Sequence, residues 1–103
     1  MIAWTDERRR IVLELRAGVE VAIPRSRALA AADVLELGRV QQRRRAAERF
    51  RVSLPLELLE GDEPTRREAA GQIRKQAAQI EAAANENRRW QRWTRKWQGG
   101  TEE

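Results

Sequence analysis

The sequence predicts an α+β fold, in which an N-terminal β-hairpin or three-stranded meander packs with a short helix and precedes a long C-terminal α-helix. Two observations lead to this expectation. Apolar residues alternate along residues 11–23, the period of strands with one buried face. Between Pro64 and Gln98 there is no further proline, and Gly71 is the one weak point, so a single helix can run through this segment. A chain of 103 residues has room for one hydrophobic core.

The hairpin is predicted from two short alternating runs. Ile11–Leu15 (IVLEL) and Val19–Ile23 (VEVAI) each place every second residue on one apolar face. Gly18 between them suits the left-handed conformation of a tight turn. Pro24 ends the second strand because proline has no N–H for the ladder. Residues 1–4 are a candidate third strand.

The middle of the chain is predicted to be helical and then briefly extended. Ser26 is the expected N-cap of an alanine-rich helix. Two positions remain possible for the C-terminus of this helix. It either stops near Gly38 or continues as an arginine-rich helix to Phe50. Val52–Leu59 (VSLPLELL), interrupted by proline, predicts a short edge strand followed by a turn of helix.

The long helix is expected to begin within residues 61–64 (GDEP), which combine a helix-ending glycine, a capping acid and a first-turn proline. The predicted organisation is a small α+β domain over residues 1–61, a long C-terminal helix over residues 62–98, and a disordered tail over residues 99–103. A helix of this length reaches about 50 Å. Residues 85–87 (NEN) are a candidate kink.

Four residues of this helix form a seam. They are spaced 4, 3 and 4 apart, which is a heptad pattern. Two uses stay open: the seam packs on the apolar face of the hairpin and completes the core, or it joins two copies as a homodimer. Alanine buries little area, so the seam alone predicts a weak dimer interface. The seam consists of Ile73, Ala77, Ile80 and Ala84.

Positive charge gathers in two stretches of the chain, whose net charge is +5. Residues 39–51 hold six arginines against Glu48, and residues 88–103 hold five basic groups against two acids. Such clustering is typical of a local contact surface for an anion, although a solvated face has the same pattern. The predicted nucleic-acid contacts are Arg43, Arg44, Arg45, Arg49, Arg88, Arg92, Arg95 and Lys96.

Residues 88–98, RRWQRWTRKWQ, hold three of the four tryptophans. On a helix, Trp90, Trp93 and Trp97 lie more than about 100° around from the seam, so they form a face of their own beside a cationic face. This face suits stacking on bases, anchoring in a groove of a protein partner, or, with less support, an anionic membrane interface. The remaining alternative is a bent helix whose indoles cover the second face of the hairpin.

The composition excludes most catalytic chemistry. The chain has no cysteine and no histidine, which excludes disulfides, thiolate metal sites, thiol nucleophiles and imidazole acid/base catalysis. The hydroxyls of Ser26 and Ser53 therefore have no histidine to activate them. The acids of residues 57–63 surround a turn, where helix capping explains them. We expect a protein that is not an enzyme and has no cofactor and no metal.

The sequence contains no pattern of membrane insertion. No apolar run approaches the roughly 20 residues that span a bilayer. Residues 1–18 lack the basic-then-apolar order of a signal peptide. The expected location is the cytoplasm.

The run RRRIVLELRAGVEVAIPRS, a leucine and alanine stretch, and then VSLPLELLEG resemble the small bacterial family known as domain of unknown function twenty-four forty-two. The resemblance covers about residues 8–61 and implies an α+β domain with an N-terminal hairpin and an antitoxin-like or regulatory role. The tryptophan-proline and acidic pair of that family are replaced here by the arginine run. The matching positions are Ile11–Leu15, Gly18, Val19–Pro24, Val52–Pro55, Leu58, Leu59 and Gly61.

These observations predict a non-enzymatic binding protein, antitoxin-like or regulatory, that contacts DNA or RNA through two arginine-rich surfaces. Trp90, Trp93 and Trp97 are expected to stack on bases or to anchor a partner. The alternative is a protein-interaction or oligomerisation module whose C-terminal helix docks on a protein partner such as a toxin, with no nucleic-acid role.

Overall fold

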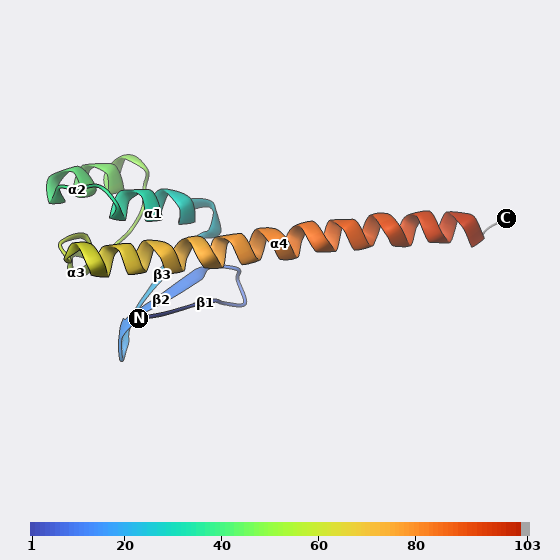
Figure 1. The fold of residues 1–103 in the computed structure, drawn as a ribbon, viewed down its shortest axis with the longest axis horizontal. Coiled ribbons are helices and arrows are strands. Elements are labelled where there is room, and N and C mark those ends of the chain that lie inside the picture. Colours follow the sequence, from blue (N-terminus) through green and yellow to red (C-terminus); the bar gives the residue numbers. More distant parts are fainter. Residues whose placement is uncertain (102–103) are drawn as a thin grey trace.

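A three-stranded antiparallel sheet and a 39-residue helix organise the molecule (Figure 1). The computed structural model describes the backbone of residues 1–101 and the side chains of residues 1–95. The predicted α+β class, with its meander and long C-terminal helix, is confirmed. The elements are β1 (Ile2–Thr5), β2 (Ile11–Arg16), β3 (Val19–Ile23), the 3₁₀ turn η1 (Arg25–Arg27), α1 (Ala28–Leu35), α2 (Val40–Arg49), α3 (Leu56–Leu59) and α4 (Glu63–Thr101).

Strand β2 is the centre of the sheet, with β1 and β3 on either side. Leu13 lies opposite Ala3 of β1 and Val21 of β3, and both Leu13 and Ile11 are completely buried. The candidate third strand at the N-terminus is therefore confirmed. Gly18 has a φ of +81° in the β2–β3 turn, a conformation that favours glycine.

The second face of the sheet carries an indole from the N-terminal strand. Trp4 lies opposite Val12 in the β1–β2 register, and Ala22 lies opposite Val12 on β3. An aromatic ring across from a β-branched residue stabilises a strand pair, and Val12 is buried. Trp90 and Trp93 remain 62% and 54% exposed, so the alternative of a bent helix whose indoles cover this face is wrong.

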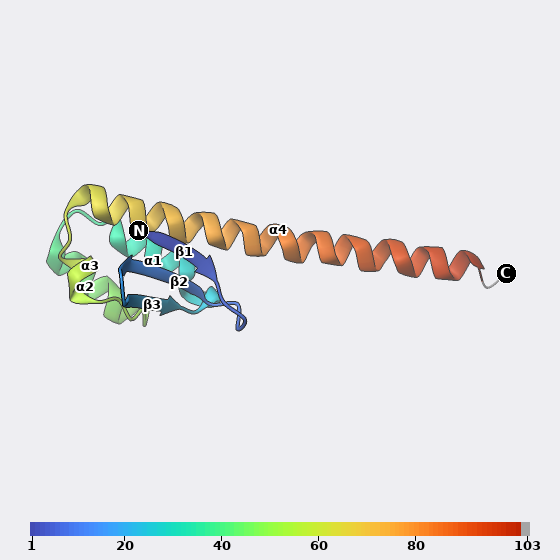
Figure 2. The same cartoon turned by 90° about the horizontal axis from the view of Figure 1, so that it is seen from below.

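The core lies between the inner face of the sheet, α1 and the first part of α4, which runs along one edge of the sheet (Figure 2). Leu13, Leu35 and Ile73 are fully buried members, one from each of these elements. Because α4 supplies part of this core, a boundary after Gly61 does not separate two folding units. Small side chains in the core let α1 and α4 approach each other closely. These side chains are Ala28, Ala31, Ala32, Ala69 and Ala70.

Helix α1 begins without a side-chain cap, so the predicted cap at Ser26 is wrong. Ser26 lies inside η1. The N–H of Arg27 donates to the Pro24 carbonyl at 2.9 Å, and the N–H of Ala28 donates to the carbonyl of Arg25. The carbonyls of the 3₁₀ turn therefore already accept hydrogen bonds from the N–H groups that a serine cap would otherwise bind.

The arginine run forms a helix of its own, α2, so α1 ends before Gly38 as the first of the two predictions had it. At the end of α2 the N–H of Val52 donates to the Ala47 carbonyl at 2.8 Å, while Arg51, at φ +55°, donates to the Glu48 carbonyl. This Schellman arrangement ties Val52 to α2 and not to a strand. The predicted edge strand is therefore wrong, whereas the turn of helix after it is confirmed as α3.

Helix α4 begins where the capping acid was predicted. The Asp62 carboxylate accepts the N–H of Thr65 at 3.0 Å, and hydrogen bonding with Thr65 lowers the pKa of Asp62. The helix is continuous through residues 85–87, so the candidate kink is absent. It continues to Thr101, inside the segment predicted as a disordered tail; residues 102 and 103 lie outside the described residues.

Two buried arginines bind the carbonyl ends of the short helices. Arg66 donates from Nη1 to the Leu35 carbonyl at 2.9 Å and to the Leu37 carbonyl at 3.0 Å. Arg43 donates from Nη1 to Leu37 and from Nε to the Leu59 carbonyl, both at 2.6 Å. Burial and the nearby charge of Arg66 lower the pKa of Arg43. These contacts join the ends of α1 and α3 to α2 and α4.

Replacing Arg66 with methionine removes a buried cation and its hydrogen bond to the Leu35 carbonyl, whereas the Leu37 carbonyl still accepts from Arg43. We expect the free energy of unfolding to fall by about 3 kcal/mol, measured by urea denaturation followed by circular dichroism. Arg67→Met is the matched control, because Arg67 is exposed and pairs with Glu63 one turn away at 2.7 Å. Such a pair contributes about 0.3 to 0.5 kcal/mol, and equal losses in the two variants would contradict the role of Arg66.

Candidate functional site

The two basic stretches lie at opposite ends of the molecule (Figure 1). Helix α2 carries the first, next to the start of α4, and the far end of α4 carries the second. The longest dimension of the structure is 64 Å. A short ligand therefore contacts one of these surfaces and not both.

On α2, one of the four predicted contact residues is not at the surface. Arg43 is 5% exposed and binds backbone carbonyls, so its guanidinium supports the fold, which corrects its assignment as a nucleic-acid contact. Arg44, Arg45 and Arg49 are exposed. The guanidinium of Arg49 lies 5.9 Å from the centre of the half-exposed Phe50 ring, a cation–π contact.

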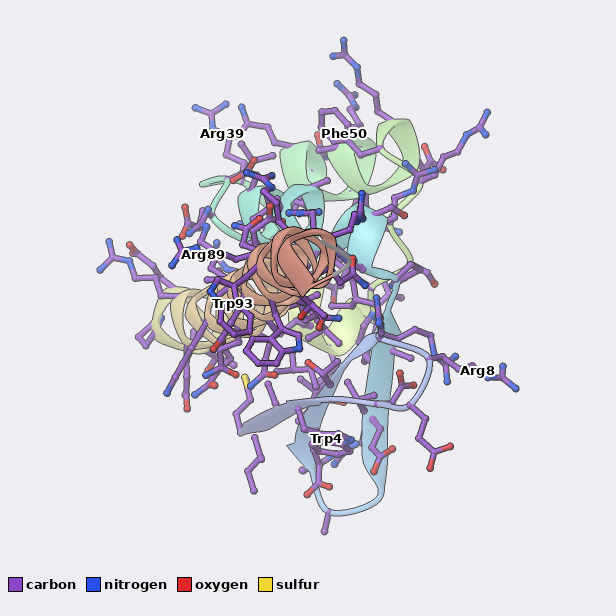
Figure 3. All side chains as sticks on the ribbon, turned by 90° about the vertical axis from the view of Figure 1, so that its right-hand side faces the viewer. Trp4, Arg8, Arg39, Phe50, Arg89 and Trp93 are labelled. Carbon is purple, nitrogen blue, oxygen red and sulfur yellow. The ribbon has the colours of Figure 1, made fainter. Side chains whose placement is uncertain are left out.

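The far part of α4 holds a stacked indole pair. The rings of Trp90 and Trp93 lie 5.3 Å apart with 20° between their planes, and both side chains are more than half exposed. This part of α4 projects away from the other described elements (Figures 1 and 2). Figure 3 shows Trp93 on the side of α4 away from Phe50. Adjacent exposed aromatic side chains mark a binding surface more often than a structural one.

Cationic side chains lie on the same turns of α4 as the indole pair. Arg89, Arg92 and Arg95 are exposed, and Arg88 donates a hydrogen bond to the side-chain oxygen of Asn85. The described residues thus place guanidinium groups on the same helical turns as the indoles. The side chains of Lys96 and Trp97, also predicted for this site, lie outside the described residues. We call Arg88, Arg89, Trp90, Arg92, Trp93 and Arg95 the indole–arginine segment.

The predicted seam closes the core of its own chain. Ile73 is completely buried, and Ala77 and Ile80 pack against the same core. Ala84 is half-buried where α4 leaves the sheet. Ile73 is therefore not available to a second copy, which corrects the alternative of an oligomer seam at that position.

A hollow that sequence reasoning missed lies where α4 leaves the sheet. Its basic side chains come from the β1–β2 turn, from η1 and from α4, and we call it the root cleft. The only sequence signal for it is the run RRR at residues 8–10. A charge count conceals this run, because acidic and basic side chains balance over residues 1–38. Its polar lining includes Arg9, Arg25, Arg88 and the carboxamides of Gln79, Asn87 and Gln91.

Three of the acidic residues around the turn before α4 have structural partners, and Asp62 among them caps the helix. The Glu57 carboxylate lies 3.4 Å from the Arg16 guanidinium, and Glu63 pairs with Arg67. In the part of the chain that the structure describes, no group of three or more acidic, histidine or cysteine side chains is placed to hold a metal ion. None of the described helices is both long and apolar enough to cross a membrane.

Comparison of the chain with protein-family models, curated proteins and solved structures finds no match. The resemblance of residues 8–61 to domain of unknown function twenty-four forty-two thus stays a prediction that rests on the matching positions.

Shortening the chain after Asn87 tests whether the indole–arginine segment belongs to the fold. We expect the free energy of unfolding to change by less than about 1 kcal/mol, because the core residues of α4 end at Ile80. The measurement is urea denaturation of the shortened chain. A control chain that ends at Gln72 lacks Ile73 and is expected not to fold. A loss of several kcal/mol in the first chain would show that the projecting segment stabilises the core.

Proposed function

We propose that this protein is a non-enzymatic nucleic-acid-binding protein whose main contact surface is the indole–arginine segment of α4. The observation that supports this most directly is the exposed, stacked pair of Trp90 and Trp93 on the same turns as four arginines. Nucleic acids present base faces that stack on aromatic rings and phosphates that bind guanidinium groups. One helix end thus offers a partner for both parts of the ligand.

Charge favours nucleic acid over the other partners. Residues 88–98 contain five basic side chains and no acid, so the same segment of a second copy is repelled. An apolar groove on a protein accommodates the indoles but leaves the neighbouring guanidinium groups without counter-charge. A polyanion that also carries aromatic bases satisfies both kinds of side chain.

The exposed arginines of α2 form a second, separate contact in this proposal. Arg44, Arg45 and Arg49 lie at the opposite end of the molecule from the indoles. A ligand long enough to reach both ends gains affinity through two linked contacts, whereas a short one gains none. Ligand length therefore separates the two surfaces experimentally.

An antitoxin-like or regulatory role in the cytoplasm completes the proposal. The role rests on the resemblance of residues 8–61, and the location follows from a nucleic-acid partner.

The test compares Arg89→Gln/Arg92→Gln/Arg95→Gln with Arg44→Gln/Arg45→Gln/Arg49→Gln, two variants that lose the same charge. Each variant is titrated with a single strand of about six nucleotides. Binding is measured by tryptophan fluorescence at low and at near-physiological salt. We expect the α4 variant to lose at least about tenfold in affinity and to flatten the slope of log K against log salt by about 2. The α2 variant should keep both values.

Two outcomes would contradict the proposal. Equal losses in the two variants would mean a general electrostatic field and not a local site. No fluorescence change with DNA or RNA, single-stranded or duplex, would remove nucleic acid as the partner and leave an acidic protein, such as a toxin, as the alternative.

A further inference from the structure

The root cleft brings together three cations from distant parts of the chain. Arg9 comes from the β1–β2 turn, Arg25 from η1 and Arg88 from α4, and the cleft encloses about 530 Å³. This volume is within the usual range of small-ligand sites. Among the described residues, Arg25 has an acidic neighbour in Glu81, whose carboxylate lies 3.9 Å from the Arg25 guanidinium. Like charges that converge in this way favour an anionic ligand.

The β1–β2 turn holds Arg9 in a defined position. The Asp6 carboxylate accepts the N–H groups of Arg8 at 3.0 Å and Arg10 at 2.7 Å, and it also accepts the Arg10 Nε at 2.9 Å. Burial raises the pKa of Asp6, but the hydrogen bonds and charge of Arg10 outweigh it and lower the pKa. Arg9 itself has a φ of +61°, and its side chain makes no hydrogen bond or ion pair within the described part of the chain. The turn thus presents an uncompensated guanidinium to the cleft.

The rest of the lining suits a nucleotide better than a simple anion. Gln79, Asn87 and Gln91 each carry both a donor and an acceptor, which match base edges and sugar hydroxyls. Ile80 and Ala84 form an apolar part of the lining. A ligand with phosphate, polar edges and apolar faces matches all three kinds of surface.

The root cleft is continuous with the indole pair. Ala83 and Asn87 line both the cleft and an open hollow beside Trp90 and Trp93. A ligand that stacks on an indole can therefore continue around α4 to Arg88 without leaving the protein surface.

We propose that the root cleft binds single-stranded nucleic acid, with a phosphate among Arg9, Arg25 and Arg88 and a neighbouring base stacked on Trp90. This inference rests on the proposed function and adds the strand type. A single strand has unpaired bases whose faces are open to aromatic side chains, whereas a duplex keeps those faces stacked on one another.

The test variant is Arg9→Gln/Arg25→Gln, and the matched control is Arg8→Gln/Arg27→Gln. Each variant removes one charge from the β1–β2 turn and one from η1. Arg8 and Arg27, however, do not line the cleft. Figure 3 shows Arg8 pointing away from α4. All four side chains are exposed, so both variants are expected to fold, which circular dichroism checks.

Tryptophan-fluorescence titrations use a single strand of about six nucleotides and a duplex of the same sequence. We expect the unaltered protein to bind the single strand at least about tenfold more tightly than the duplex. The cleft variant should lose about tenfold in single-strand affinity and flatten the salt slope by about 0.7, the value for one phosphate contact on a single strand. The control variant should change neither value.

Equal losses in the cleft and control variants, or equal affinity for duplex and single strand, would overturn the inference. If the Arg89→Gln/Arg92→Gln/Arg95→Gln variant loses binding while the cleft variant keeps it, the proposed function stands and the root cleft is not a site. If the unaltered protein binds neither ligand, both proposals fail.

Discussion

Arg43 and Arg66 hold the elements of this protein together by binding backbone carbonyls and not carboxylates. Both guanidinium groups donate to the Leu37 carbonyl, and they also reach the Leu35 and Leu59 carbonyls. The last carbonyls of a helix have no partner within it and carry partial negative charge, so a buried cation stabilises them. Two cations that meet at one carbonyl set how α1, α2, α3 and the start of α4 lie relative to one another.

That arrangement determines where α4 points. Its first part is packed against the sheet and α1 through Ile73 and Ile80, and the remainder extends away from them. The projecting part adds no core area, yet it carries the exposed indoles of Trp90 and Trp93. Exposed aromatic pairs lower solubility without stabilising the fold. The proposed nucleic-acid contact accounts for this combination.

The same residue type serves different purposes within one short helix. In α2, Arg43 is buried and structural, while Arg44 and Arg45, its neighbours in the chain, are exposed. A charge count over residues 39–51 treats them alike. Only the positions of the carbonyls that Arg43 reaches distinguish it, and those carbonyls belong to other segments of the chain.

The sequence by itself determined the features that depend on local periodicity and capping: the alternating hairpin strands, the start of α4 at Asp62, and the separation of the indoles from the seam of Ile73 and Ala77. Tertiary structure alone decided that Arg66 is buried and that Arg9 lies in the same cleft as Arg88. The physical reason is that periodicity states which side of an element is apolar, whereas the partner that covers that side comes from a distant part of the chain.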